Sequence, residues 1–152
     1  MAKVAIVVGS KTDLPSMASC RKYLEHFNIA YEEKVMSAHR NPEQTAEFAR
    51  QAQQQGYSVI IAAAGMAAHL AGTLAAHTVL PVIGVPMPGS HLNGMDALLS
   101  TVQMPTGIPV ATMAIGSAGA ANAAILAAQI LALQDDALRQ KLMTFKQQGA
   151  RL

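Results

Sequence analysis

His39 and Arg40 stand side by side in segment 35–42, which reads VMSAHRNP. An imidazole can take up or release a proton near neutral pH, and a guanidinium can hold a phosphate or carboxylate through two parallel hydrogen bonds. The segment follows a strand-like run and precedes a helical one, which is where an α/β protein presents polar side chains to a ligand. Two solvated loop residues would give the same local pattern, so the rest of the chain must decide between these interpretations.

Alternating strand-like and helical stretches make up the chain of 152 residues. Apolar, β-branched runs predict strands at 3–8, 29–36, 57–64, 80–85 and 110–115. Helices are expected over 14–27, 42–55 and 94–102, in an alanine-rich stretch ending at 133, and over a last amphipathic stretch, 135–148. The first and third runs show no polar alternation, which is typical of strands covered on both faces of a parallel sheet.

This order of elements predicts one domain over residues 1–152. Its fold class is α/β, a three-layer α/β/α sandwich with a five-stranded parallel sheet of the flavodoxin-like type. We expect the C-terminal helix, 135–148, to pack on the outside of this domain or against a neighbouring subunit. The alanine-rich helix is apolar nearly all round, which predicts that it is buried.

Ligands bind to such folds at the carboxyl ends of the strands. The loops expected at that edge are 9–13, 37–41, 65–72, 86–93 and 116–119. In the first loop, Asp13 is the expected N-cap and Pro15 falls in the first helical turn, so backbone amides and the helix dipole would favour an anion there. His69 in the third loop is flanked by apolar residues, which by default indicates a hydrogen-bonded interior histidine.

Charge is sparse and uneven along the chain. Charged residues make up 13% of the sequence, and Asp96 is the only Asp, Glu, Lys or Arg between Gln51 and Gln134. Because surfaces are normally rich in charge, we expect this stretch to be buried in the domain core and again against other subunits. A net charge of +2, without a basic cluster that contains aromatic residues, argues against nucleic acid as a partner.

Other classes of protein fit the sequence poorly. The run 109–133 is long enough to cross a bilayer, but glycines and amides interrupt it, and the N-terminal apolar run is too short for a secretory signal, so we predict a cytoplasmic protein without a membrane span. The five histidines are scattered without carboxylates or thiols at ligand spacing, so no metal site is predicted. Cys20, the single cysteine, is expected to be a packed thiol.

Six short blocks, in order and spread over nearly the whole chain, resemble the PurE family, the N5-carboxyaminoimidazole ribonucleotide mutases of purine (IMP) biosynthesis. The blocks are GSKTD at 9–13, SAHRNP at 37–42, AAHL at 67–70, PVIGVP at 81–86, VQMP at 102–105 and AGAANAA at 118–124. Several blocks in the expected order and at the expected separations are far more specific than any one of them.

The resemblance implies an isomerase that converts N5-carboxyaminoimidazole ribonucleotide to 4-carboxy-5-aminoimidazole ribonucleotide, without a metal or an organic cofactor. His39 matches the family's catalytic general acid and base. Ser10, Asp13 and Arg40 match its substrate-binding positions. The other positions expected to contact the ribonucleotide are Gly9, Ser37, Ala38, Gly65, Ala67, His69 and Leu70. The resemblance also implies a homo-octamer.

Two other functions remain open at this point. One is the sister activity on the same scaffold, direct carboxylation of aminoimidazole ribonucleotide by CO2, and the other is a non-catalytic binder of phosphorylated metabolites. The third loop also departs from the family's usual GGAAHLPGM, because Met66 replaces a glycine and Ala71 replaces the proline. Loop 88–91 is unusual as well. We expect the Met66 side chain to narrow the pocket.

Overall fold

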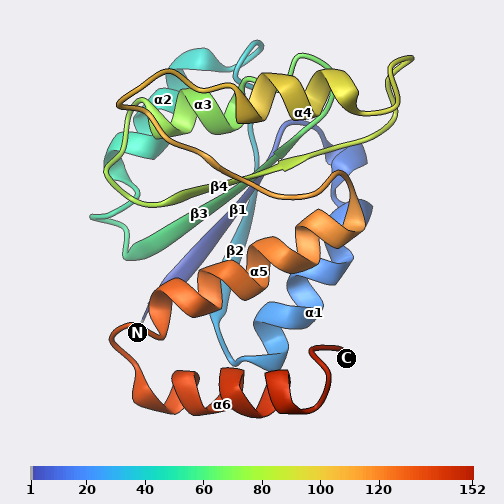
Figure 1. The fold of residues 1–152 in the computed structure, drawn as a ribbon. Helices are drawn as coiled ribbons and strands as arrows, with labels where there is room; N and C mark the ends of the chain where they lie inside the picture. Colours follow the sequence, from blue (N-terminus) through green and yellow to red (C-terminus); the bar gives the residue numbers. More distant parts are fainter. Residues whose placement is uncertain (1) are drawn as a thin grey trace.

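A five-stranded, all-parallel sheet lies between two layers of helices in the computed structural model, which describes residues 2–152 (Figure 1). The strands are β1 (Lys3–Val8), β2 (Ala30–Val35), β3 (Tyr57–Ala64), β4 (Val82–Pro86) and β5 (Ala111–Thr112). Their spatial order is β2-β1-β3-β4-β5, which is the flavodoxin-like order. The predicted fold class is confirmed.

Helices cover both faces of the sheet (Figure 1). One layer contains α1 (Ala18–His26) and α5 (Ser117–Leu131), with α6 (Asp136–Gln147) packed on its outside. The other layer contains α2 (Pro42–Gln51), α3 (Leu70–Ala75) and α4 (Met95–Val102). No helix within residues 2–152 combines the length and apolarity needed to cross a membrane.

Strand β1 is the centre of the core, because it is hydrogen-bonded on both edges and covered on both faces. Val4, Ile6 and Val8 pack toward the α1 and α5 layer. Ala5 and Val7 pack toward α2 and α3. All five side chains are fully buried, which explains why the sequence shows no polar alternation here.

Helix α5 differs from the prediction that it is buried all round. Its buried residues follow helical spacing of three and four and form one stripe against the core. That stripe consists of Gly119, Ala120, Ala123, Ala124, Ala127 and Ala128. Asn122 and Gln129 are exposed on the other side of the helix. Apolarity alone could not separate these two faces, because alanine occupies positions on both of them.

The start of the first helical segment also differs from the prediction. Lys11–Asp13 and Pro15–Met17 are 3₁₀ turns, and the α-helix begins only at Ala18. The amides of Leu14 and Met17 donate to the carbonyls three residues earlier, those of Lys11 and Leu14, at 3.2 and 3.0 Å, which is the 3₁₀ pattern. Asp13 was expected to be the N-cap, but this prediction is wrong. Ser10 takes that role, and its Oγ accepts a hydrogen bond from the amide of Thr12 at 3.3 Å.

Other boundaries shift by smaller amounts. The fifth strand contains two residues instead of six because only Ala111 and Thr112 pair with β4 at the edge of the sheet. Helix α3 was not predicted, since its short sequence, LAGTLA, has little periodic signal. Cys20 is fully buried, as expected, and burial raises the pKa of its thiol to about 12.

The last helix forms where it was predicted. The carboxylate of Asp135 caps it by accepting a hydrogen bond from the amide of Leu138 at 3.0 Å. Leu138, Leu142 and Phe145 bury its inner face against the core of the same chain. A contact between α6 and a neighbouring subunit remains a prediction.

The close approach of α5 to the segment before it gives a test of this packing. A Cβ atom at Gly119 would overlap the carbonyl oxygen of Ala114, and only a backbone shift could relieve the clash. We expect Gly119→Ala to lower the free energy of unfolding, measured in urea, by about 3 kcal/mol.

Gly72 is the matched control, because it also lies in a helix without a left-handed backbone. A Cβ atom there would meet the flexible end of Met104 at 3.0 Å. Gly72→Ala should change stability by less than about 1 kcal/mol, since alanine also favours the helix by about that amount. Equal losses in the two variants would contradict this description of the packing.

Candidate active site

A cavity of about 460 Å³ opens at the carboxyl edge of the sheet. Residues of the loops after β1, β2, β3 and β4 line it. They converge because all parallel strands end at the same edge. The predicted fifth loop, 116–119, does not line the cavity. It instead contacts the segment that leads into the loop after β4, because the amide of Gly116 donates a hydrogen bond to the carbonyl of Pro86 at 2.9 Å.

The loop after β1 presents hydroxyl and carboxyl groups to the cavity. The hydroxyls of Ser10 and Thr12 lie 2.9 Å apart, and the amide of Asp13 donates a hydrogen bond to the carbonyl of Ser10 at 3.0 Å. Asp13 is half-buried. Burial raises the pKa of its carboxyl group above the ordinary value, and a hydrogen bond from the Ser10 backbone offsets part of that effect.

The loop after β2 is closed by its own hydrogen bonds. The amide of Arg40 donates to Ser37 Oγ at 3.1 Å, and the amide of Asn41 donates to the carbonyl of Ser37 at 2.8 Å. Thr45, which is buried in α2, donates through its hydroxyl to the carbonyl of Asn41 at 2.8 Å. His39 is therefore held at the tip of a compact turn.

His39 and His69 contact each other across the cavity. His39 Nε2 lies 2.6 Å from His69 Nδ1, and the rings are nearly perpendicular, at 89°, with their centroids 4.8 Å apart. Such a hydrogen bond needs a proton on one nitrogen and a free lone pair on the other. The two rings therefore cannot both be imidazolium ions while this contact exists.

His69 is exposed in the cavity, so the default expectation of an interior histidine is wrong. The reason lies in the backbone just before it. Met66 has a left-handed conformation, with φ 55°. A tight turn follows, in which the amide of His69 donates to the carbonyl of Ala67 at 2.8 Å. The turn directs His69 outward while its neighbours Ala68 and Leu70 remain buried.

Nearly all the predicted site residues line this cavity. Those present are Gly9, Ser10, Asp13, Ser37, Ala38, His39, Gly65, Ala67, His69 and Leu70. Arg40 is exposed and does not line it. Sequence reasoning did not assign Thr12, Ser16, Met87, Pro88 and Gly89, which also line the cavity. The last three fall in a loop that was expected at this edge, and that position was the only signal for them.

Metal ligands are not grouped here. Within residues 2–152, no three His, Cys, Asp or Glu side chains are close enough together to hold a metal ion. The polar groups of the cavity are instead suited to bind a phosphorylated, hydroxyl-bearing molecule and to move a proton beside it.

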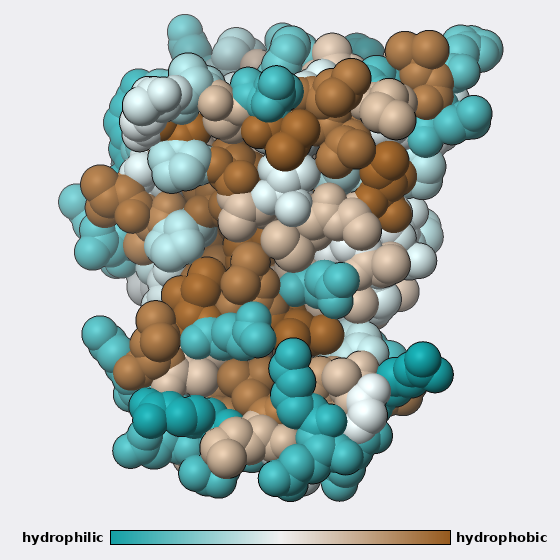
Figure 2. Space-filling view, viewed as in Figure 1, coloured by the Kyte–Doolittle hydropathy of each residue, from teal (hydrophilic) through white to brown (hydrophobic). Residues whose placement is uncertain are grey.

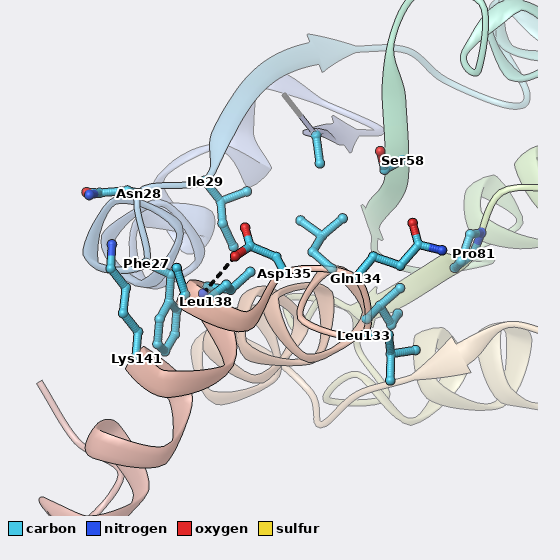
Figure 3. Close-up of a pocket in the computed structure, with 14 residues that line it drawn as sticks. Phe27, Asn28, Ile29, Ser58, Pro81, Leu133, Gln134, Asp135, Leu138 and Lys141 are labelled. Atoms are coloured by element: carbon cyan, nitrogen blue, oxygen red, sulfur yellow. Dashed lines mark hydrogen bonds between the residues drawn. The ribbon is translucent and has the colours of Figure 1, made fainter.

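A larger hollow of about 710 Å³ lies at the opposite edge, where the strands begin (Figure 3). Its lining includes Phe27, Ile29 and Leu138. The carboxylate of Asp135 already caps helix α6 there. No pair of proton-transfer groups in hydrogen-bond contact lines this hollow, so the smaller cavity is the better candidate for chemistry.

Comparison with known proteins now decides the family. The family model of AIR carboxylase matches residues 3–151. The chain belongs to the AIR carboxylase family. This confirms the resemblance to the PurE family that the six blocks indicated.

Curated relatives match this AIR carboxylase family member over almost its whole length. The N5-carboxyaminoimidazole ribonucleotide mutase of Haemophilus influenzae is 55% identical over 146 residues, which cover 96% of this chain and 89% of that protein. The mutase of the same name from Escherichia coli (strain K12) is 55% identical over 141 residues, covering 93% and 83%. The crystal structure of Treponema denticola PurE has a TM-score of 0.88 at 26% identity, covering 99% of this chain and 92% of that one.

The half-buried Asp13 makes a testable contribution to the stability of this AIR carboxylase family member. Its folded-state pKa is raised above the ordinary 3.8, so the folded state favours the protonated carboxyl. That contribution is fully present below the unfolded pKa and is lost as pH rises through the folded pKa. An asparagine side chain cannot ionise, so Asp13→Asn should raise the melting temperature at neutral pH, and the gain should shrink at about pH 3.

Thermal unfolding at the two pH values measures this effect. Asp136→Asn is the control, because Asp136 is exposed at the start of α6 and its pairing with Arg139 is a surface contact. A melting temperature of Asp13→Asn at or below that of the parent protein at neutral pH would show that burial does not penalise this carboxylate.

Proposed function

We propose that this chain is an N5-carboxyaminoimidazole ribonucleotide mutase, an isomerase of purine biosynthesis, with His39 as its general acid and base. Mutases more than half identical to it along nearly the whole chain support this function over the alternatives. The observation that carries the assignment of His39 is its hydrogen bond to His69 within a cavity lined by the mutase-like loops.

The reaction moves a carboxyl group within one molecule, and its proton balance suits a single histidine. When the carbamate C–N bond breaks, CO2 is released and the amino nitrogen takes up a proton. When ring carbon C4 then bonds to CO2, that carbon loses a proton. The two movements cancel, so a group that first gives a proton and then takes one back completes the cycle. We assign both steps to His39.

His69 acts as a positioning residue in this proposal. Its Nδ1 shares a hydrogen bond with Nε2 of His39. This hydrogen bond fixes the orientation of the His39 ring and the position of the shared proton. The two loops that carry these residues follow β2 and β3, and they flank the loop after β1. The imidazole ring of the nucleotide would therefore lie against the histidine pair with its phosphate toward that middle loop.

The remaining polar groups are assigned to the sugar and the phosphate. Ser10 and the loop amides beside it would bind the phosphate, and Asp13 would accept a hydrogen bond from a ribose hydroxyl. Arg40 is next to His39 but outside the lining, so its guanidinium would bind the phosphate or carboxylate from the mouth of the cavity. The other predicted contacts form the walls, namely Gly9, Ser37, Ala38, Gly65, Ala67 and Leu70.

A homo-oligomer belongs to the same proposal, and the family resemblance makes it an octamer. Figure 2 shows hydrophobic residues gathered over helix α4. Leu92, Met95, Leu99 and Val102 are each 44–63% exposed. They repeat at intervals of three and four residues, so they share one face of α4 and of the short segment just before it. This face lies in the stretch whose only formal charge is Asp96, and a second copy of the chain is the partner that we propose for it.

The catalytic assignment predicts how the enzyme responds to loss of the imidazole. Purified protein should convert N5-carboxyaminoimidazole ribonucleotide to the C4-carboxylated product. His39→Asn should lower kcat by ~10²–10⁴-fold, the usual value of a proton-transfer group, with little change in ribonucleotide binding. His69→Asn should lower kcat less and shift the pH profile of kcat. In that variant the His39 ring is intact and loses only the hydrogen bond that orients it.

His77→Asn is the matched control, since His77 lies outside this cavity and bonds to the carbonyl of Thr73. Near-normal turnover by His39→Asn would remove that residue from its role. Product formed from aminoimidazole ribonucleotide and bicarbonate at physiological levels would point to the carboxylase instead. If the protein binds the ribonucleotide tightly and does not convert it, the alternative of a non-catalytic binder of phosphorylated metabolites is favoured.

The assembly proposal is tested separately, by light scattering on the native protein. We expect a mass that is a multiple of 15.9 kDa, with eight copies in the complete particle. Leu99→Glu should release smaller species, because it places charge on the apolar face of α4. Met143→Glu is the matched control on α6, where the parent methionine is similarly exposed, at 50% against 53% for Leu99. A monomeric mass of the unaltered protein would refute the assembly.

A further inference from the structure

Met66 has an unusual backbone conformation for its residue type. Four non-glycine residues in the part of the chain described here have positive φ: Asn28, Met66, Asn93 and Ala150. Asparagine tolerates the left-handed region well, and alanine has the smallest side chain that must be accommodated there. Met66, with φ 55°, is the one long side chain in the set. Glycine would adopt this conformation without strain.

Packing in the core does not account for the methionine. Its side chain is 66% exposed, whereas the large apolar residues on either side of this loop, such as Leu70 and Met87, are almost completely buried. The backbone turn at Met66 is needed to bring His69 against His39, but glycine would make the same turn. The strained residue is therefore not explained by the turn or by burial.

The position of Met66 in the cavity supplies an explanation. It lines the cavity together with both histidines, in the same loop as His69 and three residues before it. Pro88 and Gly89, from the loop after β4, complete this part of the lining. Most of the polar groups come from the loop after β1 and from the turn that bears His39. Met66 thus adds a flexible, apolar side chain to a cavity whose chemistry is otherwise carried by polar groups.

We propose that Met66 is a positioning residue that covers the reaction centre and retains CO2 while it moves from the amino nitrogen to C4. This inference rests on the proposed mutase function. Free CO2 carries no charge, so hydrogen-bond donors hold it weakly, and an apolar cover is what prevents its escape. A methionine side chain is unbranched and polarizable, so it can follow the shape of the bound nucleotide. Strain at a site of this kind is expected where the side chain serves function.

The test measures where the carboxyl group goes. Each enzyme is supplied with N5-carboxyaminoimidazole ribonucleotide, and the C4-carboxylated product and the decarboxylated nucleotide are both quantified, with spontaneous decarboxylation subtracted. Met66→Gly should raise the fraction lost as decarboxylated nucleotide by about tenfold, which corresponds to losing part of the apolar burial of one side chain. Met66→Leu restores an apolar cover. It should bring the partition, meaning the ratio of C4-carboxylated product to decarboxylated nucleotide, most of the way back to that of the parent protein.

Stability separates this role from a structural one. Met66→Gly relieves the left-handed strain, so its melting temperature should not fall and should rise by about 2–4 °C. Ala150→Gly is the matched control, because it relieves the same conformation close to the C-terminus, away from the cavity. It should leave the partition unchanged.

Two results would overturn the inference alone. If the parent protein is an active mutase and Met66→Gly keeps its partition, the side chain is not a cover. If Met66→Gly lowers the melting temperature, the side chain has a packing role instead. A parent protein that converts none of the substrate would overturn the proposed function and this inference together.

Discussion

The hydrogen bond between His39 and His69 depends on the placement of β1. The two histidines follow β2 and β3, which are not neighbours in the sheet, because β1 lies between them. β2 and β3 each pair with β1 in parallel, one on either edge of it. Any slip in either pairing would move one histidine along the strand axis by about 3.3 Å per residue and break the contact. The chemistry of the cavity is thus tied to the register of β2 and β3 against β1.

That register is stable because the side chains of β1 from Val4 to Val8 are fully buried. Its side chains divide between two separate clusters, one under α1 and α5 and one under α2 and α3. A shift of one residue would exchange these two sets of side chains, which differ in size, so neither helical layer would fit. Burial on both faces therefore positions the histidines as well as stabilising the fold.

Sequence reasoning was most accurate where burial is complete. The bounds of β1 and β3 were predicted to the residue, since each is an almost continuous apolar run. It was least accurate where hydrogen bonds decide the local structure, as in the 3₁₀ turns before α1 and the two-residue β5. Ten of the eleven site residues expected from the sequence line the cavity, and Arg40 is the exception. The orientation of His69 could not be predicted, because it follows from a single left-handed residue that the pattern of apolar residues does not reveal.

The wall formed after β4 links the cavity to the apolar face of α4. Pro88 and Gly89 line the cavity, and helix α4 begins at Met95, a few residues later. The hydroxyl of Ser90 donates to the carboxylate of Asp96 at 2.7 Å, which ties this loop to the first turn of the helix. At the start of the loop, the amide of Gly116 donates a hydrogen bond to the carbonyl of Pro86. Because the loop is held at both ends, a partner that covers α4 would restrain the same wall that encloses the substrate.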